Sequence, residues 1–350
     1  MKYILSIIAV FAAVFLIAEP KLAAGAVGAA VTDCLEVIVP SLFAFSVLAA
    51  YLQRSGLYRT ALRPLTFPLS KLLRIDEELC AVFVLANIGG YPVGASLLAE
   101  LVRRGALSEK NAARMLCCCF GSGPSFIVGI VGMRVFGSAA AGLMLFAVCF
   151  LSSLAMAFIV RSGGDIELKR SETRYDLSSG AFISSVMTGA RVMLTVCAMI
   201  VGFSAISAML GYIGVNSLFK RFFGLLGAGE NSGEIFAAML EVTRIKSMAP
   251  TSSALPVCAA LLSFGGVCVI MQVAALSGKI PLKRFILSRI TASSISAFAA
   301  IPLSKILPPV DVQALAPNTS AEPFTKNAAL SVCVLIMCGI LLLEVRRDKG

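Results

Sequence analysis

The sequence predicts an all-α, polytopic membrane protein with two repeated halves, re-entrant helical hairpins and broken transmembrane helices. Of its 350 residues, 58% are hydrophobic and 14% are charged, whereas a soluble domain is usually about 45–50% apolar and about 25% charged. The mean hydropathy is +0.92, and the apolar runs are continuous and long enough to span a bilayer. A membrane β-barrel would instead show short segments of alternating hydrophobicity.

Glycine and proline interrupt the apolar stretches at corresponding places in the two halves. The first half contains 87–94 (NIGGYPVG) and 120–125 (FGSGPS), and the second half contains 241–250 (EVTRIKSMAP) and 264–266 (FGG). Lipid cannot satisfy the backbone polar groups that a broken helix exposes, so these groups must face protein or a water-filled cavity. Paired interruptions in two halves therefore indicate the binding site of a transporter.

Charge and residue usage exclude several other functions. The net charge of +11 comes from short clusters of Lys and Arg between apolar segments, which indicates cytoplasmic loops and anionic lipid headgroups as partners rather than nucleic acid. The eleven Cys contain no Cys-x-x-Cys pair and are typical of packing residues. His is absent, which excludes Ser-His catalysis and His-ligated metals. We expect no enzyme activity, no catalytic residues, no metal site and no cofactor.

The same order of segments is predicted twice: a long span, a hairpin, a broken span and an unbroken span. Two halves of similar plan usually place a binding site at their interface, as in inverted repeats. The predicted regions are an N-terminal transmembrane helix (1–30), a first membrane repeat (31–160), a polar linker (161–182), a second membrane repeat (183–307), and an external loop with a C-terminal transmembrane helix (308–350).

Residues 79–101 are predicted to form a re-entrant hairpin. Basic clusters lie on both sides, at 54–74 and 103–114, and one continuous helix would place them on opposite sides of the membrane. The positive-inside rule favours the same side for both, which a turn at 89–92 provides because Gly and Pro disfavour helix there. A crossing by 57–73 is the alternative that also resolves the conflict.

The remaining elements follow from the apolar runs and their interruptions. A short amphipathic helix is expected around Lys220, and a second hairpin at 234–260 with its break near 246–250. The predicted spans are 34–52 with Pro40, 115–134 broken at 121–124, 136–160, 183–213, 258–276 broken at 265–266, and 285–307.

The candidate substrate-binding residues lie at the interruptions. Half-helix N-termini offer about half a unit of positive charge and free N–H groups to a desolvated anion, and 122–125 (SGPS) has the pattern of such a helix start. Arg244 and Lys246 lie in an otherwise apolar stretch, where charged residues indicate a functional site. The candidates are Asn87, Gly89, Gly90, Tyr91, Gly94, Ser122, Gly123, Ser125, Thr243, Arg244, Lys246, Ser247, Gly265, Gly266 and Gln272.

Each of these groups has a structural alternative. The glycines equally suit close helix packing, and each polar side chain equally suits a tie between helices. Arg244 and Lys246 are also typical of surface anchors, and Glu241 has the spacing to pair with Arg244 on one helical face. No carboxylate lies clearly within a mid-membrane span, so a facilitated pathway and an ion-coupled pathway are equally open.

Three motifs carry a resemblance to a known family. The stretches 89–95 (GGYPVGA), 121–126 (GSGPSF) and 263–272 (SFGGVCVIMQ) resemble the family of the sporulation integral membrane protein YlbJ, also called stage V sporulation protein V. This family carries a nucleoside-recognition (Gate) domain, similar to part of the concentrative nucleoside transporters. The resemblance covers 30–305 in motif order and implies that the first repeat is Gate-like.

The resemblance implies a role in endospore formation. The expected function is a multi-pass transporter or permeation component that moves dipicolinic acid, a small organic anion, across the mother-cell-derived bacterial membrane around the forespore. The alternatives are a nucleoside-type small-molecule transporter and a non-transporting structural membrane protein of sporulation. The charged stretch 241–244 departs from the family's more neutral pattern and leaves the substrate open. The oligomeric state is also open, with a homo-oligomer among the alternatives.

Overall fold

The computed structural model describes residues 10, 13–166, 168–169, 176–225, 229–251 and 253–305. Every regular element in these residues is a helix, and five of the helices are long and apolar enough to cross a membrane. The predicted all-α, multi-pass class is therefore confirmed. The predicted external loop and C-terminal helix at 308–350 lie outside the described residues. The five membrane-length helices are Pro20–Ser55, Ala139–Ser162, Ser179–Tyr212, Ala254–Leu276 and Lys283–Ser304.

The first long helix is continuous where the sequence predicted a boundary at residue 30. It consists of α2 (Pro20–Asp33), the π-helical turn η1 (Cys34–Ile38) and α3 (Val39–Ser55). The wide turn η1 directly precedes Pro40, whose ring crowds the preceding turn and which has no N–H to donate. The sequence predicted a long or kinked span at this proline, and the structure shows a long helix with a local widening of the turn before it.

A helical hairpin follows two short helices. α4 (Tyr58–Ala61) and α5 (Arg63–Leu73) lead to α6 (Glu77–Gly89) and α7 (Tyr91–Arg103). The helices separate at Gly90, whose φ of 92° lies in the region that favours glycine. α6 and α7 then pack together, because a Cβ built on Gly94 would lie 2.9 Å from the Cβ of Ala86. The predicted break is confirmed, whereas a return to the same side of the membrane stays a prediction.

The broken span and the unbroken span of the first half lie where they were predicted. α8 (Glu109–Leu116) ends before an irregular segment, and helix resumes at Pro124. Serine side chains cap two helix starts: the Ser108 hydroxyl accepts from the Asn111 N–H at the start of α8, and the Ser138 hydroxyl accepts from the Ala141 N–H at the start of α11 (Ala139–Ser162). The elements after the break are α9 (Pro124–Phe126), η2 (Ile127–Gly132), α10 (Met133–Phe136) and α11 (Ala139–Ser162).

The second half also follows the predicted order, with one break shifted. α14 (Ser232–Leu240) ends before Glu241, whose φ of −139° and ψ of 111° are extended, so the helix stops earlier than 246–250. The Asn231 side chain bonds both the N–H and the C=O of Ala249, which closes the segment between them. The elements are α12 (Ser179–Tyr212), α13 (Val215–Leu225), η3 (Gly229–Asn231), α14 (Ser232–Leu240), the 3-10 helix η4 (Val242–Ser247), α15 (Ala254–Phe264), α16 (Gly266–Leu276) and α17 (Lys283–Ser304).

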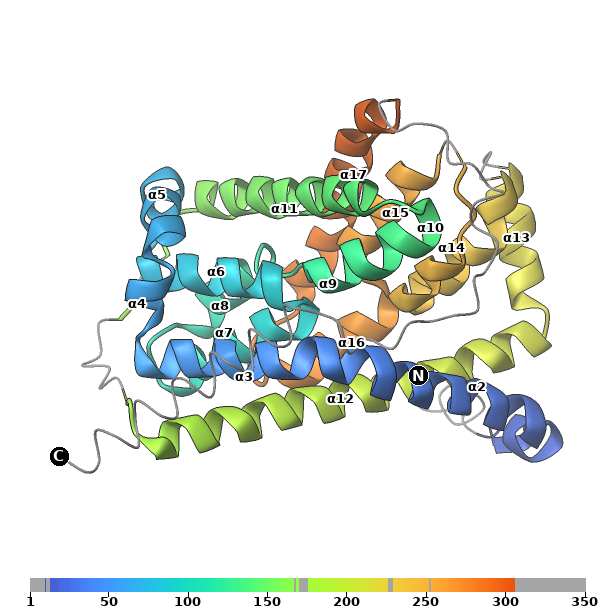
Figure 1. Ribbon diagram of the computed structural model, residues 1–350, viewed down its shortest axis with the longest axis horizontal. Helices are drawn as coiled ribbons and strands as arrows, with labels where there is room; N and C mark the ends of the chain where they lie inside the picture. Colours follow the sequence, from blue (N-terminus) through green and yellow to red (C-terminus); the bar gives the residue numbers. More distant parts are fainter. Residues whose placement is uncertain are drawn as a thin grey trace.

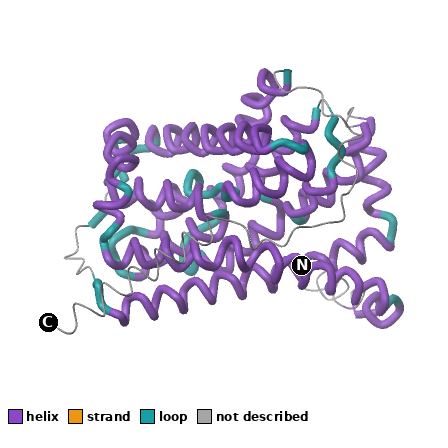
Figure 2. Tube along the Cα trace, viewed as in Figure 1, coloured by secondary structure: helices purple, strands orange, loops and turns teal. Residues whose placement is uncertain are grey.

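Long helices enclose the broken ones. Figure 1 shows α3 and α12 side by side along the lower edge and α11 along the upper edge, with the hairpin α6–α7 between them. Figure 2 shows that loop segments interrupt the helices inside this arrangement as well as at its ends. The largest buried cluster includes Tyr91 and Phe120 from the first half and Leu262 and Phe285 from the second. The two halves of the sequence thus share one core.

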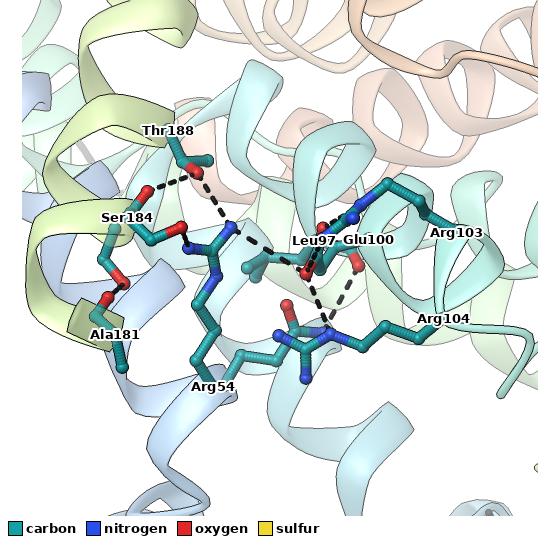
Figure 3. Close-up of polar contacts among 10 residues, drawn as sticks. Arg54, Leu97, Glu100, Arg103, Arg104, Ala181, Ser184 and Thr188 are labelled. Carbon is teal, nitrogen blue, oxygen red and sulfur yellow. Dashed lines mark hydrogen bonds and ion pairs between the residues drawn. The ribbon is translucent and has the colours of Figure 1, made fainter. Parts of the chain in front are cut away.

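A cluster of charged side chains joins α3, α7 and α12 (Figure 3). Glu100 accepts from Arg103 at 2.7 Å and from Arg104 at 2.8 Å, and Arg54 lies 3.8 Å from the same carboxylate. Arg54 also donates to the Ser184 hydroxyl of α12. Three arginines around one carboxylate leave a local excess of positive charge at the end of the hairpin.

Candidate functional site

Breaks from both halves of the chain meet around two aromatic rings. The ring centroids of Tyr91, at the start of α7, and Phe120, in the segment after α8, are 4.7 Å apart. The Tyr91 hydroxyl donates to the carbonyl of Leu262 in α15 at 2.7 Å. Gly265, between α15 and α16, has a φ of 85°, and a Cβ there would lie 2.5 Å from the Phe120 ring. The sequence predicted these interruptions separately, and the structure brings them together.

Asn87 holds two of the breaks in register. Its amide donates to the Phe83 carbonyl at 2.8 Å and to the Cys118 carbonyl at 3.3 Å. A Cβ on Gly121 would lie 2.6 Å from the Asn87 side-chain oxygen. Asn87 is 2% exposed, so it ties α6 to the irregular segment and does not reach the pocket.

Several predicted site glycines allow close packing of the chain. A Cβ on Gly94 would overlap the Cys119 carbonyl oxygen, and one on Gly89 would overlap the Phe45 ring. A Cβ on Gly266 would lie 3.2 Å from the carbonyl oxygens of Ala238 and Met239. These contacts support the packing alternative for Gly89, Gly94 and Gly266.

A pocket lies beside the converging breaks and is lined by both halves of the chain. It has about 60 Å³ of room for the centres of water molecules, where roughly 10–15 Å³ holds one water. Its wall combines many apolar side chains with a few hydroxyl, amide and carboxyl groups, as ligand sites do. The lining residues are Val37, Ile38, Ser41, Leu42, Gly90, Tyr91, Pro92, Ser122, Gly123, Phe126, Val196, Ile200, Glu241, Val242, Thr243, Cys268, Val269 and Gln272.

Helix N-termini border this pocket. α7 begins at Tyr91, the helical run Pro124–Phe136 follows Gly123, and α16 places Cys268 in the wall within its first turn. The first N–H groups of a helix have no partner within the helix, and the macrodipole adds partial positive charge there. The backbone therefore offers a favourable environment for a polar or negatively charged group.

Glu241 is an acidic residue among those that line the pocket. It is 6% exposed, and the Thr243 hydroxyl donates to its carboxyl group. The predicted Glu241–Arg244 pair on one helical face is wrong, because the chain leaves the helix at Glu241. The ion pair of Arg244 is with Glu234, at 3.5 Å between Nη2 and Oε2. Sequence reasoning treated Glu241 only as a partner for Arg244 and missed its place in the pocket.

The two cations that were expected to bind substrate lie outside the wall. Lys246 donates to Asp33 at the end of α2, with 2.6 Å between Nζ and Oδ2, and Arg244 is half-exposed beside Glu234. Each cation is thus matched by a carboxylate from another element. Ser125 and Ser247, also expected in the site, are exposed.

Arg289 is a buried cation that sequence reasoning missed, although its place inside an apolar span marks it. It is 1% exposed on α17. Its guanidinium donates to the Cys117 carbonyl and lies 3.5 Å from the Ser263 carbonyl, at the ends of α8 and α15. The charged group stacks 4.4 Å from the centroid of Phe120. Arg289 therefore supports the aromatic pair behind the pocket.

The predicted site residues divide into two groups. Within the described part of the chain, no group of three or more Cys, Asp or Glu side chains is arranged to hold a metal ion. The predicted site residues that line the pocket are Gly90, Tyr91, Ser122, Gly123, Thr243 and Gln272. Those that lie elsewhere are Asn87, Gly89, Gly94, Ser125, Arg244, Lys246, Ser247, Gly265 and Gly266.

Comparison with curated proteins matches the chain to the sporulation integral membrane protein YlbJ of Bacillus subtilis (strain 168), with 31% identity over 144 residues. The match covers 39% of this chain and 35% of YlbJ, so it spans only about a third of that relative's length. Models of known protein families give no match, and no solved structure matches. The resemblance drawn from the glycine-rich motifs is confirmed at this level: the chain is a multi-pass membrane protein similar to YlbJ, a sporulation integral membrane protein.

Proposed function

We propose that this protein is a membrane transporter or permeation component that binds a small molecule in the pocket beside the helix breaks. The observation that carries this proposal is the convergence of breaks from both halves on one pocket. Interrupted helices leave backbone groups that lipid cannot satisfy, and transporters use such groups to bind substrate. This use of the backbone supports a role in transport rather than in catalysis.

The proposed substrate is a small organic anion, with dipicolinic acid as the first to test. The helix N-termini at the pocket support an anion, since their N–H groups replace lost water. Similarity to a sporulation protein supports the membrane around the forespore as the proposed location. Exposed cations such as Arg103 support contact with anionic lipid headgroups.

A nucleoside-type substrate is the second candidate. The pocket wall places Glu241, Thr243 and Gln272 among apolar residues and the Tyr91 ring. Carboxylate, hydroxyl and amide groups suit the hydroxyl groups of a sugar, and the apolar surface suits a planar base. Exchange measured with each substrate in turn distinguishes the two candidates.

Exchange of labelled substrate by the purified full chain in liposomes tests the proposal. We expect the wild type to exchange dipicolinate, whereas empty liposomes should not. Exchange should fall by about tenfold in Gln272→Leu, because the loss of one polar contact costs roughly 1.4 kcal/mol. Thr243→Val should act likewise, whereas Thr195→Val, the same change on α12 outside the pocket, should leave exchange unchanged.

The outcomes against the proposal are distinct. Exchange of nucleosides but not dipicolinate would replace the first substrate by the second. Absence of exchange for both would favour a structural role in the membrane. Exchange that is equal in the wild type, Gln272→Leu and Thr243→Val would move the binding site away from this pocket.

A further inference from the structure

Among the described residues that line the pocket, Glu241 is the only one with a carboxyl group. It is 6% exposed, and the Thr243 hydroxyl donates to it. The position is firmly set, because the extended backbone at Glu241 follows α14 directly, and the neighbouring Val242 N packs against Gly266 of α16. The burial of Glu241 and its hydrogen bond from Thr243 keep the side chain away from solvent.

The charges around Glu241 do not neutralise it directly. In the described residues, the ion pair of Lys246 is with Asp33 and that of Arg244 is with Glu234, and neither pair includes Glu241. The residues that α12 brings to the pocket, Val196 and Ile200, are apolar. Glu241 has electrostatic interactions with five titratable groups. These are Asp33 of α2, Cys34 of η1, Arg244 and Lys246 of η4, and Cys268 of α16.

A buried carboxylate without a paired cation becomes neutral or takes up a cation. Burial raises the pKa of Glu241, and the charge of Asp33 adds to this effect, whereas the Thr243 hydrogen bond, Arg244 and Lys246 oppose it. A metal cation would need several oxygen ligands, and no other carboxylate lines the described pocket. A proton needs only the carboxyl group.

We propose that Glu241 binds a proton that crosses the membrane together with the substrate. This inference depends on the proposed function of the pocket as a transport site. An ionised Glu241 would repel an anion that the helix N-termini attract, and protonation removes that repulsion. The carboxylate takes its proton from water on one side, and it returns the proton to water on the other side after the substrate leaves.

Accumulation of dipicolinate in liposomes tests the coupling. The full chain is reconstituted, and the membrane potential is held at zero with potassium and valinomycin. With the outside more acidic by about one pH unit, we expect the wild type to accumulate dipicolinate about tenfold for one proton per substrate. Glu241→Gln should lose the accumulation, and the exchange that it retains at equal pH should not respond to the pH gradient. Glu109→Gln, an exposed carboxylate on α8, is the matched control and should behave as wild type.

Several results would overturn the proposal. These are full accumulation by Glu241→Gln, accumulation driven by a sodium gradient instead of a proton gradient, and wild-type exchange that a pH gradient does not drive. If Glu241→Gln fails to fold, Glu241→Asp replaces it, and we expect this variant to keep the coupling with a shifted pH optimum. Loss of coupling in a well-folded Glu241→Asp would count against proton binding at this position.

A second measurement needs no substrate and separates failure of this inference from failure of the proposed function. Infrared difference spectra of the reconstituted protein follow the C=O band of a protonated carboxyl group during a pH titration. We expect a band in the wild type and in Glu109→Gln that is absent from Glu241→Gln and that titrates above the ordinary Glu value of about 4.3. Absence of such a band would overturn proton binding, even if dipicolinate is transported.

Discussion

Arg289 is the largest side chain that the described residues bury completely. No carboxylate in them lies within ion-pair distance of it, and its guanidinium instead faces the Cys117 and Ser263 carbonyls. These carbonyls belong to the C-terminal ends of α8 and α15, where the helix macrodipole is negative. Stacking on Phe120 and on Phe285, at 4.4 Å and 4.9 Å, adds cation–π attraction. Two broken helix ends thus replace the missing carboxylate.

Replacement of Arg289 tests this account. Arg289→Met keeps much of the volume but leaves the Cys117 carbonyl without its donor, so we expect a loss of about 1–3 kcal/mol in stability. Arg289→Ala should cost more because it also leaves a cavity, and Arg289→Lys should cost less than Met. Thermal unfolding in detergent measures the order. If the Met variant is as stable as the wild type or more stable, the desolvation of the Arg289 charge costs at least as much free energy as its contacts contribute.

At the scale of elements, the helix breaks are maintained by backbone shape and by close packing together. Gly90 and Gly265 have positive φ values, which end one helix and redirect the chain into the next. Proline lies near the start of the helix after two of the breaks, Pro92 after Gly90 and Pro124 after Gly123, where its missing N–H is not needed. The same residues that interrupt the helices therefore also start the ones that border the pocket.

Gly265→Ala should disturb its break more than the backbone conformation alone explains. An alanine there has to hold a φ of 85° and also meets the Phe120 ring. Gly278→Ala is the matched control, because Gly278 has a φ of 61° and nothing within 4 Å of its Cβ position. We expect about 1–2 kcal/mol from the positive φ in both variants. Gly265→Ala should lose additional stability and substrate exchange.

Thermal unfolding and the liposome exchange assay compare the two variants. Equal effects of the two substitutions would mean that the Phe120 ring moves away without cost. The contact between the breaks would then contribute nothing to the pocket.

At the scale of the whole molecule, one pocket joins residues from distant parts of the chain. The first half of the chain contributes residues of η1, α3, the hairpin α6–α7 and the segment around Pro124, and the second half contributes residues of α12, η4 and α16. The Asp33–Lys246 ion pair crosses a sequence separation of 213 residues. A change in the relative position of the two halves would therefore alter both this ion pair and the pocket.

The predicted re-entry of α6–α7 is tested by labelling single introduced cysteines from one side of the membrane. Arg74→Cys and Lys110→Cys flank the hairpin at exposed positions, and Arg134→Cys lies at the far end of the broken span, also exposed. We expect the first two to react with a membrane-impermeant maleimide from the same side and the third from the other side. The native protein is the background control. Labelling of positions 74 and 110 from opposite sides would show that 79–101 crosses the membrane.

Local sequence was sufficient to predict the class, the order of the helices and most of the breaks. Apolar length, Gly and Pro act on the backbone of the residues around them, so the breaks at Gly90, 121–124 and 265–266 could be located without knowledge of any partner. The end of α14 could not be located from the sequence in this way. Glu241 follows an apolar helix with no Gly or Pro beside it, and its extended backbone accompanies close packing against Gly266.

The sequence by itself determined that this chain is a multi-pass helical membrane protein and where most of its helices are interrupted. The tertiary structure alone decided which interruptions meet, that Lys246 pairs with Asp33, and that Glu241 rather than Arg244 lines the pocket. The physical reason is range. Helix formation and its interruption depend on neighbours along the chain, whereas a charge takes its partner from whatever distant residue the packing brings within a few ångströms.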